Sequence, residues 1–437
     1  MNEIISRFIL YTDRGREDIL TRLSDIIRCA KEGSEDCDVL RTRAFSQIKE
    51  LLILATDYGF DEDLWANYIT YRIITDENPF SLTAEKAGRR EGSVNLLAES
   101  DFTAFYQLMH YDFKWLDELL GMNCFSILRS YKAVIKPEEM YNRNVSEKVR
   151  TLSSKLMASA DVQEFSDHVM DFYRDYGVGM FGLNKAFRFR SDGEKITFLP
   201  VNNMQQVSLD DLIGYEIQKE KLLQNTRAFV SGQKANNCLL FGDSGTGKST
   251  CIKAVVNKFY PDGLRMIEIY KHQFRDLSNI IAGIKNRNYK FIIYMDDLSF
   301  EEDETEYKFL KAVIEGGVET KPDNILIYAT SNRRHLIKET WGDRADVSVE
   351  QGIHKSDNME EKLSLANRFG VTISFSKPSR QEYFDIAIAL CRRNGIDLPE
   401  NVIRMEANKW ELSHGGVSGR TAEQFAKHMI VFKDNTH

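Results

Sequence analysis

Residues 237–259 read NCLLFGDSGTGKSTCIKAVVNKF: an apolar run, a glycine-rich turn and an amphipathic segment follow one another directly. The turn fits the pattern G-x-x-x-x-G-K-[ST] from Gly242 to Ser249, and its flanks predict a strand before it and a helix after it. Gly242, Gly245 and Gly247 let backbone N–H groups converge on phosphate oxygens, and the helix adds the positive end of its dipole. The stretch predicts a phosphate-binding loop. A glycine-rich turn with an exposed lysine is the alternative interpretation.

The two residues after the last glycine of the turn carry distinct chemistry. Lys248 is placed to reach the β and γ phosphates as a point charge, and Ser249 to offer its hydroxyl to Mg²⁺. We therefore expect ATP and Mg²⁺ as cofactors. The nucleotide-binding residues of the loop are expected to be Gly242, Asp243, Ser244, Gly245, Thr246, Gly247, Lys248, Ser249 and Thr250.

Short apolar segments alternate with helical ones from about Val207 onward. Five of them, NCLLFG, RMIEIY, KFIIYMDD, NILIYATS and GVTISFS, have the length and composition of buried parallel strands. This alternation predicts an α/β fold with a parallel sheet and crossover helices. Helical periodicity before about Lys185 predicts an all-helical N-terminal region, and helical stretches after Pro378 predict a small C-terminal lid.

These patterns give four expected segments: a helical region 1–188, a β-hairpin linker 189–206, a nucleotide-binding core 207–376 and a helical lid 377–437. The hairpin rests on the alternation in FRFRSDGEKITFLPV, around a Ser-Asp-Gly-Glu turn. Within the helical region, DENPFSLTAEKAG contains Pro79 and Ser81, which we expect to interrupt a helix, with a new helix starting at Thr83. We interpret this stretch as a loop between helices rather than a docking site.

Two acids follow the strand KFIIYMDD. A carboxylate beside the phosphate loop can hold the Mg²⁺ shell, and we assign that role to Asp296. Asp297 is the candidate for orienting or deprotonating the attacking water. Because Asp is one methylene shorter than Glu, Glu301 or Glu302 remains an alternative base. Two acids that simply cap the next helix are the simpler interpretation.

The strand NILIYATS ends at Thr330 and Asn332, on the edge where open α/β sheets bind ligands. We choose Asn332 as the residue that hydrogen-bonds the γ phosphate or the attacking water. An Asn in the turn after a strand also occurs for local reasons.

Three more features surround the predicted nucleotide. Arg368 precedes the last strand, from where it can reach the γ phosphate of a neighbouring subunit as an arginine finger. Arg420 begins a lid helix and can reach the nucleotide of its own chain. A turn containing Leu212, Ile213 and Gly214 precedes the phosphate loop, and we assign Ile213 and Gly214 to the adenine site.

In this order the features resemble AAA+ ATPases: Walker A, Walker B, sensor 1, arginine finger, sensor 2 and a helical lid. DDLSFEED, PDNILIYATSNRRHL, NRFG and GRTAEQF look similar to a bacterial AAA+ family known only as a domain of unknown function. The resemblance implies ATP hydrolysis and assembly into a ring or partial ring, and it gives Asp296, Asp297, Asn332, Arg368 and Arg420 the Walker B, base, sensor 1, finger and sensor 2 roles. The Asp-Asp pair departs from the usual Asp-Glu, and Arg333 and Arg334 are rival finger candidates.

Composition limits the partners. The chain has 437 residues, and 58 Lys plus Arg against 66 Asp plus Glu give a net charge of −8, so bulk charge does not attract nucleic acid or an anionic membrane. The basic clusters KNRNYK and NRRHLIK are interpreted as solvated faces, and a nucleic-acid partner is not favoured. Six scattered cysteines and the absence of a long apolar run predict a cytoplasmic protein without a membrane partner.

Two functions remain open from the residues. The first is an ATP-driven machine that remodels or assembles an unidentified protein or other macromolecule. The second is a slow, nucleotide-gated assembly switch or scaffold with little turnover. A small-molecule kinase is disfavoured because it explains neither the lid arginine nor the NRFG element.

Overall fold

The computed structural model describes residues 1–12, 18–88, 92–134, 143–193, 196–202, 204–300, 304, 306–315, 322–333, 336 and 365–434. The chain divides into two compact units, one of residues 1–184 with 200–203 and one of residues 185–199 with 204–437. Each unit is described by itself below.

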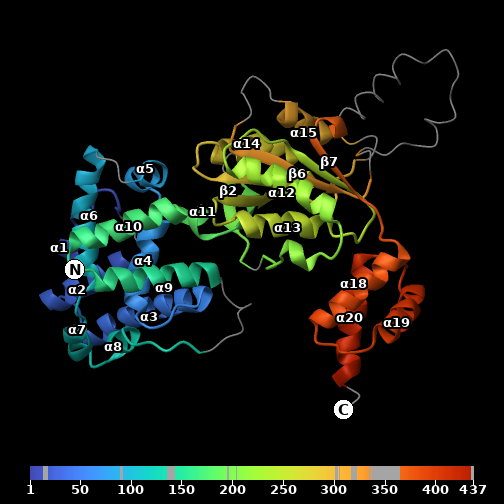
Figure 1. Ribbon diagram of the computed structural model, residues 1–437. Coiled ribbons are helices and arrows are strands. Elements are labelled where there is room, and N and C mark those ends of the chain that lie inside the picture. Colours follow the sequence, from blue (N-terminus) through green and yellow to red (C-terminus); the bar gives the residue numbers. More distant parts are fainter. Residues whose placement is uncertain are drawn as a thin grey trace. The chain divides into compact units, whose positions relative to one another are not determined.

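The first unit is helical, as the periodicity of its sequence predicts (Figure 1). Its helices are α1 (Asn2–Ile5), α2 (Ile19–Glu32), α3 (Cys37–Tyr58), α4 (Leu64–Thr75), α5 (Pro79–Ala87), α6 (Ser93–Met109), α7 (Lys114–Leu119), α8 (Cys124–Leu128), α9 (Arg143–Ala158), α10 (Val162–Tyr176) and α11 (Gly179–Leu183).

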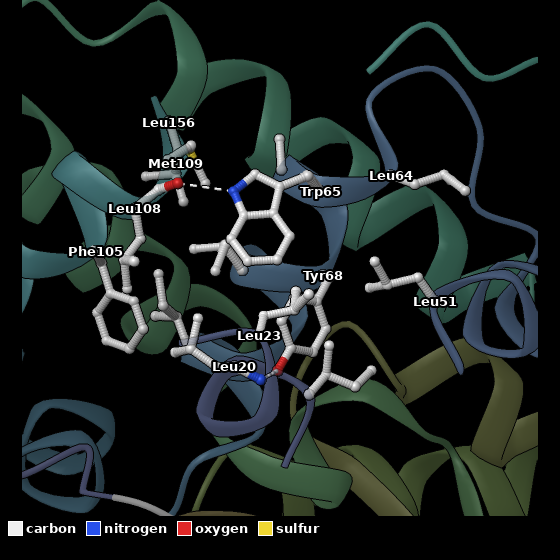
Figure 2. Packing of buried hydrophobic residues seen from close by; sticks show 14 of the residues in the cluster. Leu20, Leu23, Leu51, Leu64, Trp65, Tyr68, Phe105, Leu108, Met109 and Leu156 are labelled. Atoms are coloured by element: carbon white, nitrogen blue, oxygen red, sulfur yellow. Dashed lines mark hydrogen bonds between the residues drawn. The ribbon is translucent and has the colours of Figure 1, made fainter. Parts of the chain in front are cut away.

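Helix α4 lies at the centre of this unit, and most of its residues are buried. Figure 2 shows Trp65 and Tyr68 of α4 among leucines from several other helices. The indole N–H of Trp65 donates to the backbone oxygen of Leu108 at 2.7 Å, and the hydroxyl of Tyr68 accepts from the backbone N–H of Leu20 at 3.2 Å. The polar atoms of these large side chains are thus satisfied within the core.

The prediction that a helix starts at Thr83 is wrong, because α5 begins at Pro79. Proline suits the first position of a helix, where its missing N–H costs nothing. Asn78 caps the helix by accepting from the backbone N–H of Phe80 and Ser81, and the Ser81 hydroxyl accepts from the backbone N–H of Asn78. The interpretation of DENPFSLTAEKAG as a loop is therefore wrong for most of its length, because only residues 76–78 connect α4 to α5.

The second unit is built on a seven-stranded sheet with the order β2-β1-β4-β5-β6-β3-β7. Its strands are β1 (Ala186–Ser191), β2 (Ile196–Pro200), β3 (Cys238–Gly242), β4 (Leu264–Glu268), β5 (Lys290–Met295), β6 (Ile325–Ser331) and β7 (Val371–Phe375). The five neighbouring pairs from β1 to β7 are parallel. The five predicted core strands are therefore confirmed, and the phosphate-loop strand β3 lies between β6 and β7.

The two strands expected as a hairpin at 189–206 are present as β1 and β2, which are adjacent in the sheet. They lie at the edge of the seven-stranded sheet that is opposite β7. Helices α12 (Glu216–Val230) and α13 (Lys248–Phe259) contact each other, and α14 (Leu277–Ile284) contacts α15 (Glu306–Glu315) (Figure 1). Two short 3₁₀ turns, η2 (Leu209–Asp211) and η3 (Lys271–Asp276), complete the core.

Three C-terminal helices form the predicted lid: α18 (Arg380–Arg393), α19 (Glu400–Ser413) and α20 (Gly419–Asp434). They share a hydrophobic cluster that includes Tyr383, Ile403 and Phe425. Ile213 of the core packs against this cluster. In the part of the chain that the structure describes, no helix has the length and apolar character needed to cross a membrane.

Candidate functional site

The phosphate loop takes a backbone path that requires its glycines. Gly242, Gly245 and Gly247 have φ values of 129°, 75° and 87°, in the region that favours glycine. A Cβ on Gly242 would lie 2.0 Å from the carbonyl oxygen of Phe375, and a Cβ on Gly247 would lie 2.3 Å from the Leu212 side chain. Gly247 is also the N-cap of α13, so the loop runs directly into the helix N-terminus.

Lys248 folds back over the loop. Its ammonium donates to the carbonyl oxygens of Gly242 at 2.9 Å and Asp243 at 2.6 Å, and to Oδ1 of Asn332 at 3.1 Å. Burial lowers the pKa of Lys248 below its ordinary value of 10.5, although nearby carboxylates oppose that shift. These three acceptors hold the ammonium over the loop.

The first acid, Asp296, meets the loop at Ser249. Oδ1 of Asp296 accepts from the hydroxyls of Ser249 at 2.7 Å and Thr330 at 2.6 Å. Burial alone would raise the pKa of this carboxyl, but the neighbouring hydroxyls of Thr330, Tyr294 and Ser249 outweigh burial and lower it below the ordinary 3.8. Asp296 is therefore ionised at neutral pH.

The second acid, Asp297, adopts a left-handed backbone with φ of 50°. Its N–H donates to the Thr330 hydroxyl at 2.9 Å, and its Oδ1 accepts from Nδ2 of Asn332 at 2.7 Å. Aspartate tolerates this conformation better than most residues. The backbone turn and the amide of Asn332 together fix where the Asp297 carboxylate lies.

A cavity of about 690 Å³ opens beside these groups. It is lined by the phosphate-loop residues Ser244 to Thr250 with Asp296, Asp297, Thr330 and Asn332. Its other lining residues come from the segment before α12 and from the lid: Gln205, Val207, Asp211, Leu212, Ile213, Tyr215, Ile386, Leu390, Arg393, Asn394, Gly419, Arg420, Glu423, Ala426 and Lys427. The lining thus combines charged and polar groups with apolar side chains, as ligand sites commonly do.

The segment just before α12 has an unusual backbone. Ile213 lines the cavity, whereas Gly214 does not; Gly214 and Tyr215 both have positive φ, 81° and 61°. The Tyr215 hydroxyl donates to the carbonyl oxygen of Ser376 at 2.8 Å. The expected adenine segment is thus tied to the connection between β7 and the lid.

The lid reaches the loop and the segment before α12 through its own residues. The backbone N–H of Arg420 donates to the carbonyl oxygen of Gly245 at 3.2 Å, while the Arg420 side chain is exposed at the cavity. Arg393 of α18 donates to Oδ1 of Asp211 at 3.0 Å and to the carbonyl oxygen of Asp210 at 2.8 Å. Near the loop, Lys377 donates its backbone N–H to Oδ2 of Asp243 at 2.8 Å.

Arg368 does not line this cavity. It is exposed in the turn before β7, at the amino end of an edge strand, whereas the cavity lies at the carboxyl ends of the strands. Glu301, Glu302 and Arg334, which the sequence offered as an alternative base and a rival finger, lie outside the described residues. Arg333 is described, with its N–H bonded to the Ser331 hydroxyl.

Several residues at the site were missed by the sequence interpretation. Thr330 was predicted to lie at the end of the strand but was given no role. Its hydroxyl contacts both acids. Tyr294, two residues before Asp296, was also missed; it is fully buried on β5. Arg393 and Asp211 are 182 residues apart in the chain, so no local pattern could connect them.

The donor set fits a magnesium ion. Ser249 and Asp296 supply a hydroxyl and a carboxylate oxygen, hard ligands of the type that Mg²⁺ takes in small number beside phosphates and water. Among the described residues, no group of three or more His, Cys, Asp or Glu side chains is placed to hold a metal ion. These ligands are not the set that a transition metal prefers.

A comparison with protein families matches residues 183–431 to the family described as "Protein of unknown function (DUF815)". This match covers more than half of the 437 residues. The chain belongs to the DUF815 family. The DUF815 region contains the whole sheet and nearly all of the lid, and its fold is the predicted parallel α/β core with a helical lid.

Three solved structures of Thermotoga maritima RuvB are similar to this DUF815 protein: the Holliday junction branch migration motor and two variants of RuvB, each with one residue replaced. Their TM-score is 0.36, with 15% or 16% sequence identity over 51% of this chain. The present chain covers 64% of the length of those chains. No curated protein matches the sequence.

Proposed function

We propose that this protein binds ATP with Mg²⁺ and hydrolyses it to drive the remodelling or assembly of a macromolecular partner. One observation carries the proposal: a continuous hydrogen-bonded chain runs from Ser249 through Asp296, Thr330, Asp297 and Asn332 to Lys248 in the lining of the cavity. It joins the residue types needed to hold a triphosphate, its cation and a water molecule.

Each member of the chain has a proposed task. Bound Mg²⁺ with ATP supplies charge neutralisation at the phosphate groups. Ser249 and Asp296 hold the cation, and Lys248 neutralises the β and γ phosphates. Asp297 orients or deprotonates the attacking water, and Asn332 keeps the Asp297 carboxylate in place. Arg420 contributes a second positive charge from the lid, and Ile213 contacts the adenine.

The position of Arg368 supports assembly of several copies. A five-residue strand is about 16 Å long, so Arg368 at the amino end of β7 is remote from the cavity of its own chain. We therefore propose that it acts on the nucleotide of a neighbouring copy in a ring or partial ring. The segments 1–188, 189–206, 207–376 and 377–437 stay predictions. A cytoplasmic location is also proposed, and the six free cysteines support it.

A second function, the slow assembly switch, is favoured by the geometry of Asp297. Its side chain is one methylene shorter than Glu, and the Asn332 amide holds one of its oxygens. Both features disfavour fast proton abstraction from water. In this alternative ATP holds the copies together, and the helical unit recruits the partner.

Phosphate release separates the two functions. We expect wild-type protein with Mg²⁺ and ATP to release phosphate above the level of a Lys248→Ala variant. Lys258→Ala, an exposed lysine at the end of the same helix, is the matched control and should behave as wild type. Binding of ATP without phosphate release, with or without cellular partners, would refute the motor and leave the switch. No binding at all would refute both.

Asp297→Asn is the variant for finding the partner. Asparagine tolerates a left-handed backbone, so the loop geometry should persist while the proposed base is lost. The variant should bind ATP as tightly as wild type and split it at least tenfold more slowly. Used as bait in the native cell, it should retain the partner longer than Lys248→Ala does.

A further inference from the structure

Arg393, the last residue of α18, joins the lid to the core beside the cavity. Its guanidinium donates to the carbonyl oxygen of Asp210 at 2.8 Å, and to the carbonyl oxygen and Oδ1 of Asp211 at 3.4 Å and 3.0 Å. Arg393 and Asp211 both line the cavity. The proposed reaction gives neither of them a task.

The contact is made at the end of the short turn η2, and a helical turn leaves its last carbonyl groups without partners inside it. Two cations share the carbonyl oxygens here. The buried Lys219 of α12 donates to the carbonyl oxygens of Leu209 at 3.5 Å and Leu212 at 2.9 Å. Arg393 takes the two carbonyl oxygens between them. The core therefore holds η2 with one cation and the lid holds it with the other.

This tie lies where two sets of apolar side chains meet. Ile386, Leu390 and Arg393 follow one another at spacings of four and three residues on α18, and all three line the cavity. Ile213, two residues after Asp211, also lines the cavity and packs against the lid cluster that contains Ile386. Arg393 thus fixes how far this face of α18 stands from Ile213.

The neighbouring arginine shows the contrast. Arg392 pairs with Glu400, so its ion pair stays within the lid. The side chains of Arg393 and Asp211 are 44% and 43% exposed, and ion pairs this exposed contribute little to folding stability. Only the Arg393 pair connects the lid to the segment that carries Ile213.

We propose that Arg393 is a positioning residue for the nucleoside, which holds α18 against η2 so that the adenine fits between Ile213 and the lid. This role rests on the proposed function. Because the tie acts on the space for the base, its loss should weaken ATP and ADP by the same factor. A direct contact from Arg393 to the γ phosphate would instead weaken ATP more than ADP.

The test compares Arg393→Ala with the wild-type chain in titrations of ATP and ADP at saturating Mg²⁺. We expect both Kd values to rise about fivefold, near the upper limit for an exposed ion pair. Dissociation of a fluorescent ATP analogue should quicken by a similar factor, since affinity changes at one site appear mostly in the dissociation rate. Arg393→Lys keeps the charge without the forked donor geometry and should recover part of the loss.

Arg392→Ala is the matched control, and it should bind both nucleotides as wild type does. Unchanged Kd values in Arg393→Ala would overturn the proposal, and so would a loss confined to ATP or an equal loss in Arg392→Ala. The thermal unfolding midpoint of nucleotide-free Arg393→Ala should stay close to that of wild type; a variant that no longer folds would make the tie a structural contact and refute the positioning role. If the wild-type protein binds neither nucleotide, it is the proposed function that fails.

Discussion

At the scale of single residues, the phosphate loop depends on backbone conformations that only certain side chains accept. Gly242 is the most constrained of these residues, because its φ is 129° and Phe375 of β7 leaves no room for a Cβ. The chain also provides a glycine with a positive φ and open space around it, Gly263 at 87°. An alanine at Gly242 would meet both crowding and backbone strain, whereas an alanine at Gly263 would meet backbone strain alone.

Gly242→Ala should lower the free energy of unfolding by about 3 kcal/mol or more and abolish nucleotide binding, since the added methyl must displace β7. Gly263→Ala carries only the backbone strain and should cost roughly 1–2 kcal/mol with nucleotide binding intact. Urea unfolding measures the stability of each variant, and nucleotide titration measures its binding. Equal losses of stability in the two variants would show that crowding at β7 is not the cause.

The lowered pKa of Lys248 gives a pH prediction. The charged ammonium binds phosphate, and a lowered pKa makes the neutral form appear below the ordinary 10.5, so ATP affinity should fall as the pH rises toward that value. Calorimetric titrations from neutral pH to about pH 10 measure it. Lys248→Arg keeps its charge and should show a flatter alkaline limb, whatever its absolute affinity. An alkaline limb that persists in Lys248→Arg would contradict this assignment.

The phosphate loop, both acids and Asn332 could be predicted from the sequence. The loop follows a short sequence pattern, and the acids and Asn332 come directly after apolar strands. The left-handed backbone of Asp297 and Tyr215 could not, since each depends on contacts with distant segments: Thr330 and Asn332 for the first, Ser376 for the second.

At the scale of elements, α5 shows how a helix start is decided. Pro79 was interpreted as an interruption, yet the structure uses it as the first residue of the helix, with Asn78 as the cap. The pattern Asn-Pro-x-Ser was legible in the sequence as a start signal. Proline ends a helix when it lies in the interior, but it suits the first helical position, as it does here.

Asn78→Ala should lower the free energy of unfolding by about 1–2 kcal/mol, because the backbone N–H of Phe80 and Ser81 lose their buried acceptor. Thr83 is exposed within the same helix and caps nothing, so Thr83→Ala is the control and should change stability by less than about 0.5 kcal/mol. Denaturant midpoints compare the two. A larger effect at Thr83 would support a helix start there after all.

At the scale of the whole molecule, the chain carries separate cores. The first unit has its own large cluster around α4, and the second has a buried sheet and a smaller cluster within the lid. The proposed nucleotide contacts belong to the second unit alone. The overall division was predictable from the change of periodicity near Lys185, whereas the lid contacts, made by residues far apart in the chain, were not.

Calorimetric unfolding should accordingly show two transitions, of which MgATP shifts one. At a concentration a hundredfold above Kd, the ligand should add about 2.7 kcal/mol to the unit that binds it and nothing to the other. Lys248→Ala should show both transitions without the shift. A single transition that moves as a whole with MgATP would mean that the two units unfold together.

The connection between β7 and the lid is held at two points, by the Asp243 carboxylate at Lys377 and by the Tyr215 hydroxyl at Ser376. Because α18, α19 and α20 share one hydrophobic cluster, they form a single packed body. The connection therefore ties that whole body to a phosphate-loop residue and to a residue that lines the cavity. A shift of either anchoring residue is passed to all three lid helices together.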